Sequence, residues 1–173
     1  MLKILKGSKY PSVNSHINYL TVGIAEYKVS RNPRILVTYA LGSCIAVILH
    51  DPYRKIGAMV HAMLPEPKTP RIDNPIKYVS TSIPIILREL KRYGCNLKVL
   101  ESAIIGGAHI LKLPKSINIG SKNVEIARKI LKEYNIRIVE EDVGGNYSRT
   151  VFYELATGKI YVYIPKTKLS LLS

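Results

Sequence analysis

The stretch IAVILHDPYRKIGAMVHAML, residues 45–64, decides the fold of this chain. Its two apolar runs, Ile45–His50 and Ile56–Leu64, lack the polar alternation of a strand with one wet face, so they are typical of strands buried on both faces. Between them, Asp51–Lys55 begins with Asp-Pro and indicates a turn. The stretch therefore predicts a hairpin whose two strands lie inside the protein.

Working outward from the hairpin, the sequence predicts further strands and two amphipathic helices. The strands fall at 19–29, 34–39, 97–105, 136–143, 151–155 and 159–164, and the helices at 75–93 and 121–134. Pro84 should kink the first helix or leave Ser82 as the cap of a shorter one, and Gly94 should end it. The predicted fold class is α/β: a layered sandwich of mixed, largely antiparallel β-sheet with two main amphipathic helices.

The domain organisation follows from length and composition. A chain of 173 residues fits one domain, which we place at 18–165, with a basic N-terminal arm at 1–17 and a short C-terminal tail at 166–173. With 47% hydrophobic and 22% charged residues, the chain is neither disordered nor fibrous. Neither a transmembrane run nor a secretory signal is expected. Two cysteines without a CxxC pair favour a reducing, cytoplasmic location.

The formal net charge of +14 leaves two interpretations open. It suits an acidic partner, and it equally suits a thermostable surface rich in lysine and arginine. A basic nucleic-acid binder would draw on the same charge and on the twelve tyrosines, but no recognised DNA- or RNA-binding motif supports that alternative.

Cys44 is the first candidate for chemistry. It follows Leu-Gly-Ser and directly precedes a predicted buried strand, so small neighbours leave the backbone open to a substrate. The backbone N–H groups of Ser43 and Cys44 are then candidate donors to an oxyanion. The alternative is a cysteine that only packs, which is the commoner situation.

The predicted register of the hairpin brings His61 near Cys44 and so favours a catalytic role for Cys44. Across a five-residue turn, His50 should face Ile56. The same register sets Cys44 opposite Ala62, and a one-residue bulge would bring Cys44 opposite His61, with Cβ atoms ~5 Å apart. A thiol beside an imidazole can supply a thiolate nucleophile and a general acid. The alternative for His61 is a hydrogen-bonded core histidine.

Thr38 ends the preceding strand and carries a hydroxyl that can accept from the imidazole N–H and orient the ring. By itself it is an ordinary strand residue, and His109 and Asn146 are the next candidates for this third position. No residues have metal-site spacing. Gly106-Gly107 and Gly144-Gly145-Asn146 do not match a phosphate-binding loop and indicate tight turns. We therefore expect no cofactor and no metal.

A series of short segments also occurs in a characteristic order. The segments are Val22–Tyr27, Val37-Thr38, Leu41–Cys44, Asp51-Pro52, Gly57–Met59, His61–Pro65, Lys77-Tyr78, Gly106–Ala108, Asn118–Gly120, Asn123-Val124, Glu141-Asp142 and Gly144–Asn146. Any one of them would be weak evidence. The ordered set, over about residues 21–164, resembles the CheD family of chemoreceptor glutamine deamidases.

The resemblance implies a cysteine hydrolase on a layered α/β sandwich, with Cys44, His61 and Thr38 as its catalytic residues. It implies an amidohydrolase that converts specific glutamines on the cytoplasmic helices of chemoreceptors (methyl-accepting chemotaxis proteins) to glutamate and releases ammonia. It further implies binding to a CheC-type phosphatase of the chemotaxis response regulator. We expect no nucleic-acid partner and no insertion into a membrane.

A function of another class stays open from the sequence alone. The chain could be a binding module that regulates a CheC-type phosphatase, with vestigial activity. That alternative predicts that Cys44→Ala leaves signalling intact while surface substitutions abolish it.

Overall fold

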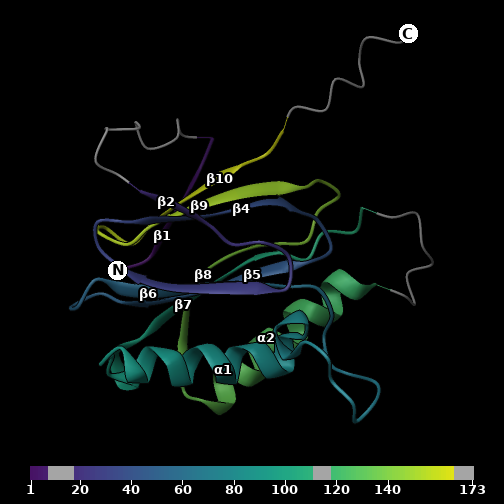
Figure 1. Cartoon of the computed structure of the whole chain (residues 1–173). Coiled ribbons are helices and arrows are strands. Elements are labelled where there is room, and N and C mark those ends of the chain that lie inside the picture. The colour runs from purple at the N-terminus through teal and green to yellow at the C-terminus, as the bar shows by residue number, and fades with distance from the viewer. Residues whose placement is uncertain (8–17, 111–117, 166–173) are drawn as a thin grey trace, which may run out of the picture.

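Two five-stranded sheets pack face to face, and both helices cover the outer face of one of them (Figure 1). The computed structural model describes residues 1–7, 18–110 and 118–165. Sheet A has the strand order β1-β10-β9-β4-β2, and sheet B has the order β3-β6-β5-β7-β8. The predicted layered sandwich of mixed, largely antiparallel sheet with two main helices is confirmed.

The elements have the following bounds. In sheet A they are β1 Lys3–Lys6, β2 Tyr19–Thr21, β4 Ile35–Leu41, β9 Arg149–Glu154 and β10 Lys159–Tyr163; in sheet B they are β3 Glu26–Arg31, β5 Ile45–Asp51, β6 Ile56–Ala62, β7 Glu101–Gly106 and β8 Arg137–Val143. The helices are α1 Val79–Arg92 and α2 Ile119–Glu133, with short 3-10 helices at Pro75–Lys77 and Leu97–Val99.

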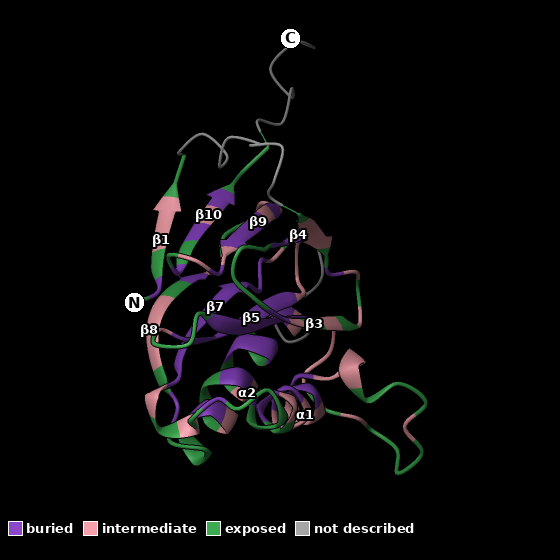
Figure 2. Cartoon of the chain, turned by 60° about the vertical axis from the view of Figure 1, so that its left-hand side comes forward, coloured by how far each residue is buried: buried purple, intermediate pink, exposed green. Residues whose placement is uncertain are grey.

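The β5–β6 hairpin lies inside the molecule, as its apolar sequence predicted. Figure 2 shows β5 in the buried colour between sheet A and the helices. Alternate residues of β5 face opposite sides: Ile45, Val47 and Leu49 pack with the helices, whereas Ala46 and Ile48 pack between the two sheets. Every residue of both strands is buried. The space between the sheets is therefore where polar groups of the hairpin meet polar groups of sheet A.

Helix α1 runs through Pro84 without interruption, so Ser82 is an interior residue and not a cap. The buried apolar face on both sides of the proline, including Ile83 and Ile86, holds the helix in place although one backbone hydrogen bond is lost. Gly94 follows the helix with a φ of 88° and donates its N–H to Lys91 O, as expected of a residue that ends a helix.

Two strands that the sequence indicated are divided in the structure. The segment 19–29 contributes β2 to sheet A and β3 to sheet B, with a break at Ala25, whose φ is 57°. The segment 97–105 opens with a 3-10 helix, because the Asn96 side chain accepts from the Lys98 N–H, and only then becomes β7. In both cases a local backbone feature outweighs β-forming composition.

The first residues do not form an arm. Leu2 is buried, and Lys3–Lys6 pair in parallel with β10 at the edge of sheet A. This part of the expectation for 1–17 is wrong: Leu2 and Ile4 pack against the core between the sheets, and the exposed Lys3 and Lys6 suit the edge of a sheet. Residues 8–17 and the expected tail at 166–173 lie outside the described residues.

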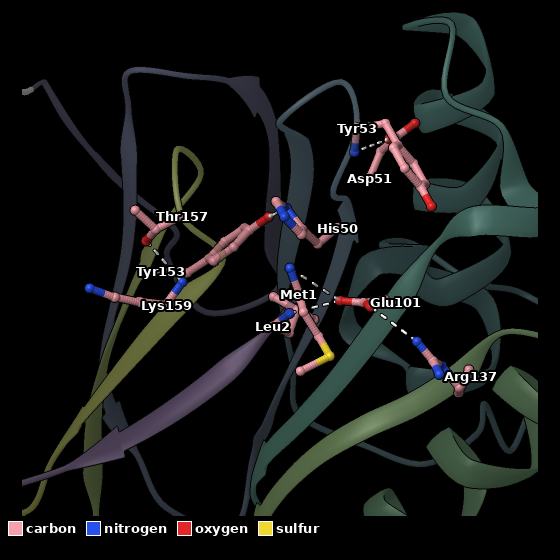
Figure 3. A network of polar contacts seen from close by, with 10 residues as sticks. All are labelled: Met1, Leu2, His50, Asp51, Tyr53, Glu101, Arg137, Tyr153, Thr157 and Lys159. Atoms are coloured by element: carbon pink, nitrogen blue, oxygen red, sulfur yellow. Dashed lines mark hydrogen bonds and ion pairs between the residues drawn. The ribbon is translucent and has the colours of Figure 1, made fainter.

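A polar network closes the sandwich at the turn end of the hairpin (Figure 3). His50 Nδ1 lies 2.6 Å from the Tyr153 hydroxyl of sheet A. Glu101 accepts from the Leu2 backbone N–H at 2.7 Å and pairs with Arg137 at 3.1 Å. The network therefore joins both sheets at the end of the hairpin away from Cys44. No helix within the described ranges is long and apolar enough to cross a membrane.

Candidate active site

Thr38 and His61 meet across the space between the two sheets. Thr38 Oγ1 on β4 lies 2.8 Å from His61 Nδ1 on β6 and 2.8 Å from the carbonyl oxygen of Val22. Because a carbonyl can only accept, the Thr38 hydroxyl donates to Val22 and accepts from the N–H at Nδ1 of His61. This pair of bonds fixes the tautomer of the imidazole and leaves Nε2 unprotonated.

The free nitrogen of His61 is buried and has no hydrogen-bond partner in the described part of the chain. Only two other buried side-chain atoms there share this condition, Asp51 Oδ2 and Asn123 Oδ1. An unpartnered buried acceptor is unfavourable for stability. Nε2 of His61 is therefore available to take a proton from a nearby group.

Cys44 lies on the same face of sheet B as His61, although the expected register is wrong by one residue. Asp51 pairs with Ile56, so the turn has four residues and Ala46 faces His61. Cys44 precedes Ala46 by two positions and packs against the cluster between the sheets. It is thus a diagonal neighbour of His61, at a typical separation of about 7–8 Å between such positions, and no bulge is needed.

The shorter turn has a local cause. The Asp51 side chain accepts from the N–H groups of Tyr53 and Arg54, and its carbonyl accepts from Lys55 N–H at 2.9 Å. Asp51 can therefore act as the last residue of β5 while organising the turn that follows.

Burial shifts both ionisable groups towards their neutral forms. It lowers the pKa of His61 from 6.5 to about 4. It also raises the pKa of the Cys44 thiol, with the residue's own backbone N–H opposing the shift. The free site therefore holds a neutral thiol and a neutral imidazole, rather than the thiolate that the sequence interpretation emphasised.

The loop before β5 is held through its carbonyl oxygens. Ala108 N–H donates to Gly42 O at 2.9 Å, and Gly107 N–H donates to Cys44 O at 2.8 Å. Within the described ranges, no acceptor is bound to the backbone N–H of Ser43, and that of Cys44 lies beside its own sulfur. Both N–H groups are thus placed near the thiol, as donors to an oxyanion must be.

Gly106 allows this close approach. Its φ is 109°, and a Cβ at this position would lie 2.5 Å from Cys44 O. Any larger residue would push the end of β7 away from the loop that carries Cys44. Gly107, whose φ is 64°, follows directly, so two glycines in succession let the chain run close beside the Cys44 loop; no turn is assigned at 106–108.

Asn123 of α2 is the site neighbour that reasoning from the residues missed. Its side-chain nitrogen donates to Ser43 O at 3.0 Å and to Met63 O at 2.9 Å. Two signals could have pointed to it: its position on the buried face of an amphipathic helix, where an apolar residue is usual, and its place in the segment Asn123-Val124 of the ordered set.

Among the described residues, Thr38 is the one hydrogen-bond partner of the His61 ring, and neither His109 nor Asn146 is bonded to it. Asn146 is exposed. Among the described residues there is no cluster of three or more histidines, cysteines or acidic residues that could bind a metal ion.

A pocket of about 460 Å³ lies just beyond β6. Its lining combines apolar side chains with two lysines: Leu64, Pro65, Glu66, Lys68, Thr69, Tyr78, Ile119 and Lys122. Since Met63 O is bound by Asn123 and Leu64 follows Met63, the pocket adjoins the loops that carry the candidate site.

Comparisons with known proteins identify relatives of the whole domain. Residues 63–163 match the family described as CheD chemotactic sensory transduction. The chemoreceptor glutamine deamidase CheD of Thermotoga maritima is 45% identical over 141 residues, covering 82% of this chain and 88% of that protein. Probable chemoreceptor glutamine deamidases CheD of Thermococcus kodakarensis and Pyrococcus abyssi are 38% and 40% identical, over 80% and 82% of this chain and 88% of each relative.

One solved structure, the Bacillus licheniformis hypothetical protein YfiH, is similar with a TM-score of 0.42 and 16% identity, covering 67% of this chain and 48% of that one. The relatives at 38–45% identity carry the assignment, because each alignment spans at least 80% of this chain. Together with the family match over residues 63–163, they establish that the chain belongs to the CheD family.

Proposed function

We propose that this chain is a chemoreceptor glutamine deamidase in which Cys44 is the nucleophile, His61 the general base and acid, and Thr38 the group that orients His61. One observation carries the residue assignment: Thr38 holds Nδ1 of His61, while Nε2 stays unpartnered on the face that Cys44 shares. The reaction is the one named for the Thermotoga maritima relative.

The first half of the reaction forms a thioester. Nε2 of His61 accepts the thiol proton as Cys44 Sγ attacks the side-chain carboxamide carbon of a receptor glutamine. The oxygen of the tetrahedral intermediate accepts from the N–H groups of Ser43 and Cys44. The carbon–nitrogen bond then breaks, and the nitrogen leaves as ammonia with the proton that His61 returns.

The second half hydrolyses the thioester. Nε2 of His61 takes a proton from a water molecule, which attacks the thioester carbon. The carbon–sulfur bond breaks, the thiol of Cys44 regains its proton, and a glutamate side chain is released. One water is consumed and one ammonia is formed for each glutamine, so no metal or other cofactor enters the balance.

The charge of the protein is consistent with this substrate. The formal net charge of +14 favours encounter with acidic receptor helices, and Lys68 and Lys122 line the pocket that adjoins the site. We also propose a cytoplasmic location, because the receptor helices on which the enzyme would act are cytoplasmic. We also propose a CheC-type phosphatase as a protein partner, on the strength of family membership.

Mass spectrometry of chemoreceptor cytoplasmic fragments tests the function. Incubation with the wild-type protein should convert specific glutamines to glutamate and release an equal amount of ammonia, whereas Cys44→Ala should do neither. Unmodified glutamines with the wild-type protein would refute the proposal. If Cys44→Ala converted the glutamines at the wild-type rate, Cys44 would not be the nucleophile. If Cys44→Ala restored signalling fully in a deletion strain, the alternative of a binding module would be favoured.

A further inference from the structure

The Cys44 loop lies just past the end of the β5–β6 ladder. The last backbone pair of that hairpin is Ile45 with Ala62, so Cys44 and Met63 lie one step further along. Beyond this pair, the backbone N–H groups of Gly107 and Ala108 tie the Cys44 loop to the end of β7. Among the described residues, no backbone hydrogen bond ties that loop to the segment that follows β6.

The side chain of Asn123 joins these two segments. Its nitrogen donates both hydrogens across the gap, to Ser43 O at 3.0 Å and to Met63 O at 2.9 Å. Ser43 immediately precedes Cys44, and Met63 follows His61 by two residues. The amide of Asn123 thus acts as a side-chain rung where the backbone rungs have stopped.

The orientation of this amide follows from its partners. Both neighbours are carbonyl oxygens, which can only accept, so the NH₂ group has to face them. The oxygen of the amide is then left buried without a partner in the described part of the chain. Asn123 itself is fully buried on α2, on the helix face that packs against sheet B. Burying this amide oxygen without a partner is unfavourable, and an apolar residue at position 123 would pack the helix without that cost. Helix packing alone therefore does not explain an asparagine here.

We propose that Asn123 is a positioning residue that holds Cys44 at its working distance from His61. It acts through the two loops and has no contact with substrate. The inference rests on the proposed roles of Cys44 and His61. Since small displacements of a nucleophile from its base are costly to rate, its loss should lower kcat and leave substrate binding largely unchanged.

The test uses Asn123→Ala with Asn118→Ala as the matched control. Asn118 also lies at the start of α2, where its side chain accepts from Ser121 N–H, so its loss weakens the same helix without releasing the two loops. We expect Asn123→Ala to lower kcat about 10- to 100-fold with KM within about 2-fold. Asn118→Ala should keep kcat within about 2-fold. Equal losses of kcat in the two variants would overturn the proposal.

A second readout does not depend on deamidation. The rate at which iodoacetamide labels Cys44 should fall in Asn123→Ala and in His61→Ala, and the double variant should lose no more than His61→Ala alone, because both changes act on the same pair. Fully additive losses would overturn the role of Asn123. If the wild-type protein failed to deamidate receptor fragments, the proposed function would fall, while this labelling test would still decide the positioning role.

A measurement on the wild-type protein covers the case in which Asn123→Ala does not fold. The two side-chain amide protons of Asn123 should exchange slowly with solvent in NMR spectra, because both are bonded and buried. Rapid exchange of either proton would show that the amide does not bridge the loops.

Discussion

The two buried histidines of the β5–β6 hairpin make an informative pair. His61 and His50 both point into the space between the sheets, and each has Nδ1 hydrogen-bonded to a hydroxyl of sheet A, from Thr38 and Tyr153 respectively. Burial lowers the pKa of each to about 4. By burial, hydrogen bonding and pKa alone, the two residues could not be distinguished.

Their surroundings differ. His50 lies among charges, since the N-terminus, Glu101 and Asp51 all act on its pKa, and the backbone of Gly158 closes over its ring: a Cβ there would lie 3.2 Å from Nε2. His61 has no resolved charge acting on its pKa, and its Nε2 has no partner among the described residues. The difference teaches that a shifted pKa does not by itself mark a catalytic imidazole, and that His61 stands apart because it is the diagonal neighbour of Cys44.

Replacing each histidine in turn should give the largest difference between them. His61→Ala should lower kcat by roughly 10²- to 10⁴-fold, the range of general acid–base contributions, at a stability cost of about 1–2 kcal/mol. His50→Ala should retain kcat within about 2-fold but lose about 1–3 kcal/mol, because it leaves the buried Tyr153 hydroxyl without its partner. Steady-state kinetics and urea denaturation check both. A similar loss of activity in the two variants, or loss of cooperative unfolding in His61→Ala, would favour a core histidine at position 61.

The two hydroxyls should differ in the same sense. Thr38→Ala should lower kcat roughly 10- to 1000-fold, because the imidazole loses its fixed tautomer. Thr38→Ser should retain most activity, since its hydroxyl can still donate to Val22 and accept from His61. Tyr153→Phe is the matched control and should leave kcat nearly unchanged. Kinetics of the three variants decide, and wild-type turnover by Thr38→Ala would reduce Thr38 to a strand residue.

Both histidines should contribute to the pH dependence of the free energy of unfolding, whereas only His61 should contribute to the pH dependence of kcat/KM. Each folded-state pKa is about 4, below the ordinary 6.5, so the unfolded chain binds more protons between these values. Stability is then complete above about pH 6.5 and is lost as pH falls towards 4, by about 3 kcal/mol for each histidine. His50→Ala should flatten this loss without moving the acid limb of kcat/KM, which belongs to His61 and should lie near pH 4. Urea denaturation and pH–rate profiles give the two curves, and an acid limb near pH 6.5 would contradict the burial effect.

The smallest expected effect is the difference in labelling rate between the two cysteines, and it should come more from the accessibility of the thiols than from their ionisation. Cys44 is half-buried beside His61, whereas Cys95 is 6% exposed with its pKa raised to about 11. We expect iodoacetamide to label Cys44 at least about 10-fold faster at pH 7–8, mainly because the reagent reaches the buried Cys95 poorly and also because few thiolates form there. Peptide mapping after timed labelling measures both rates. Equal rates in the folded protein would speak against a thiol assisted by an imidazole.

The features that can be predicted from the sequence are those with a local signal. The apolar runs around residues 45–64 identify the buried hairpin, and Gly94 marks the end of α1. The register failed by one residue because Asp51 belongs to the strand as well as to the turn, which only the backbone pairing reveals. Even so, Cys44 and His61 lie on one face of the sheet.

Long-range contacts could not be predicted from the residues alone. Asn123 binds carbonyl groups that are 80 and 60 positions away in the chain, and neither spacing has a periodic signature. The edge strand Lys3–Lys6 was missed because four residues with two lysines carry too little pattern for a strand to be inferred. The contact of Thr38 with His61 was implied by family resemblance, and geometry alone left other residues open for that position.

The bond between Thr38 and His61 crosses from sheet A to sheet B, and this has a consequence for newly made chains. A molecule that had formed only sheet B and its helices would already carry the thiol and the imidazole. Its imidazole would still lack a fixed tautomer, because the hydroxyl that selects it arrives with the other sheet. Full activity therefore requires that the two sheets have packed together. Incompletely folded or damaged chains should deamidate the glutamines of neighbouring proteins more slowly than the folded enzyme does.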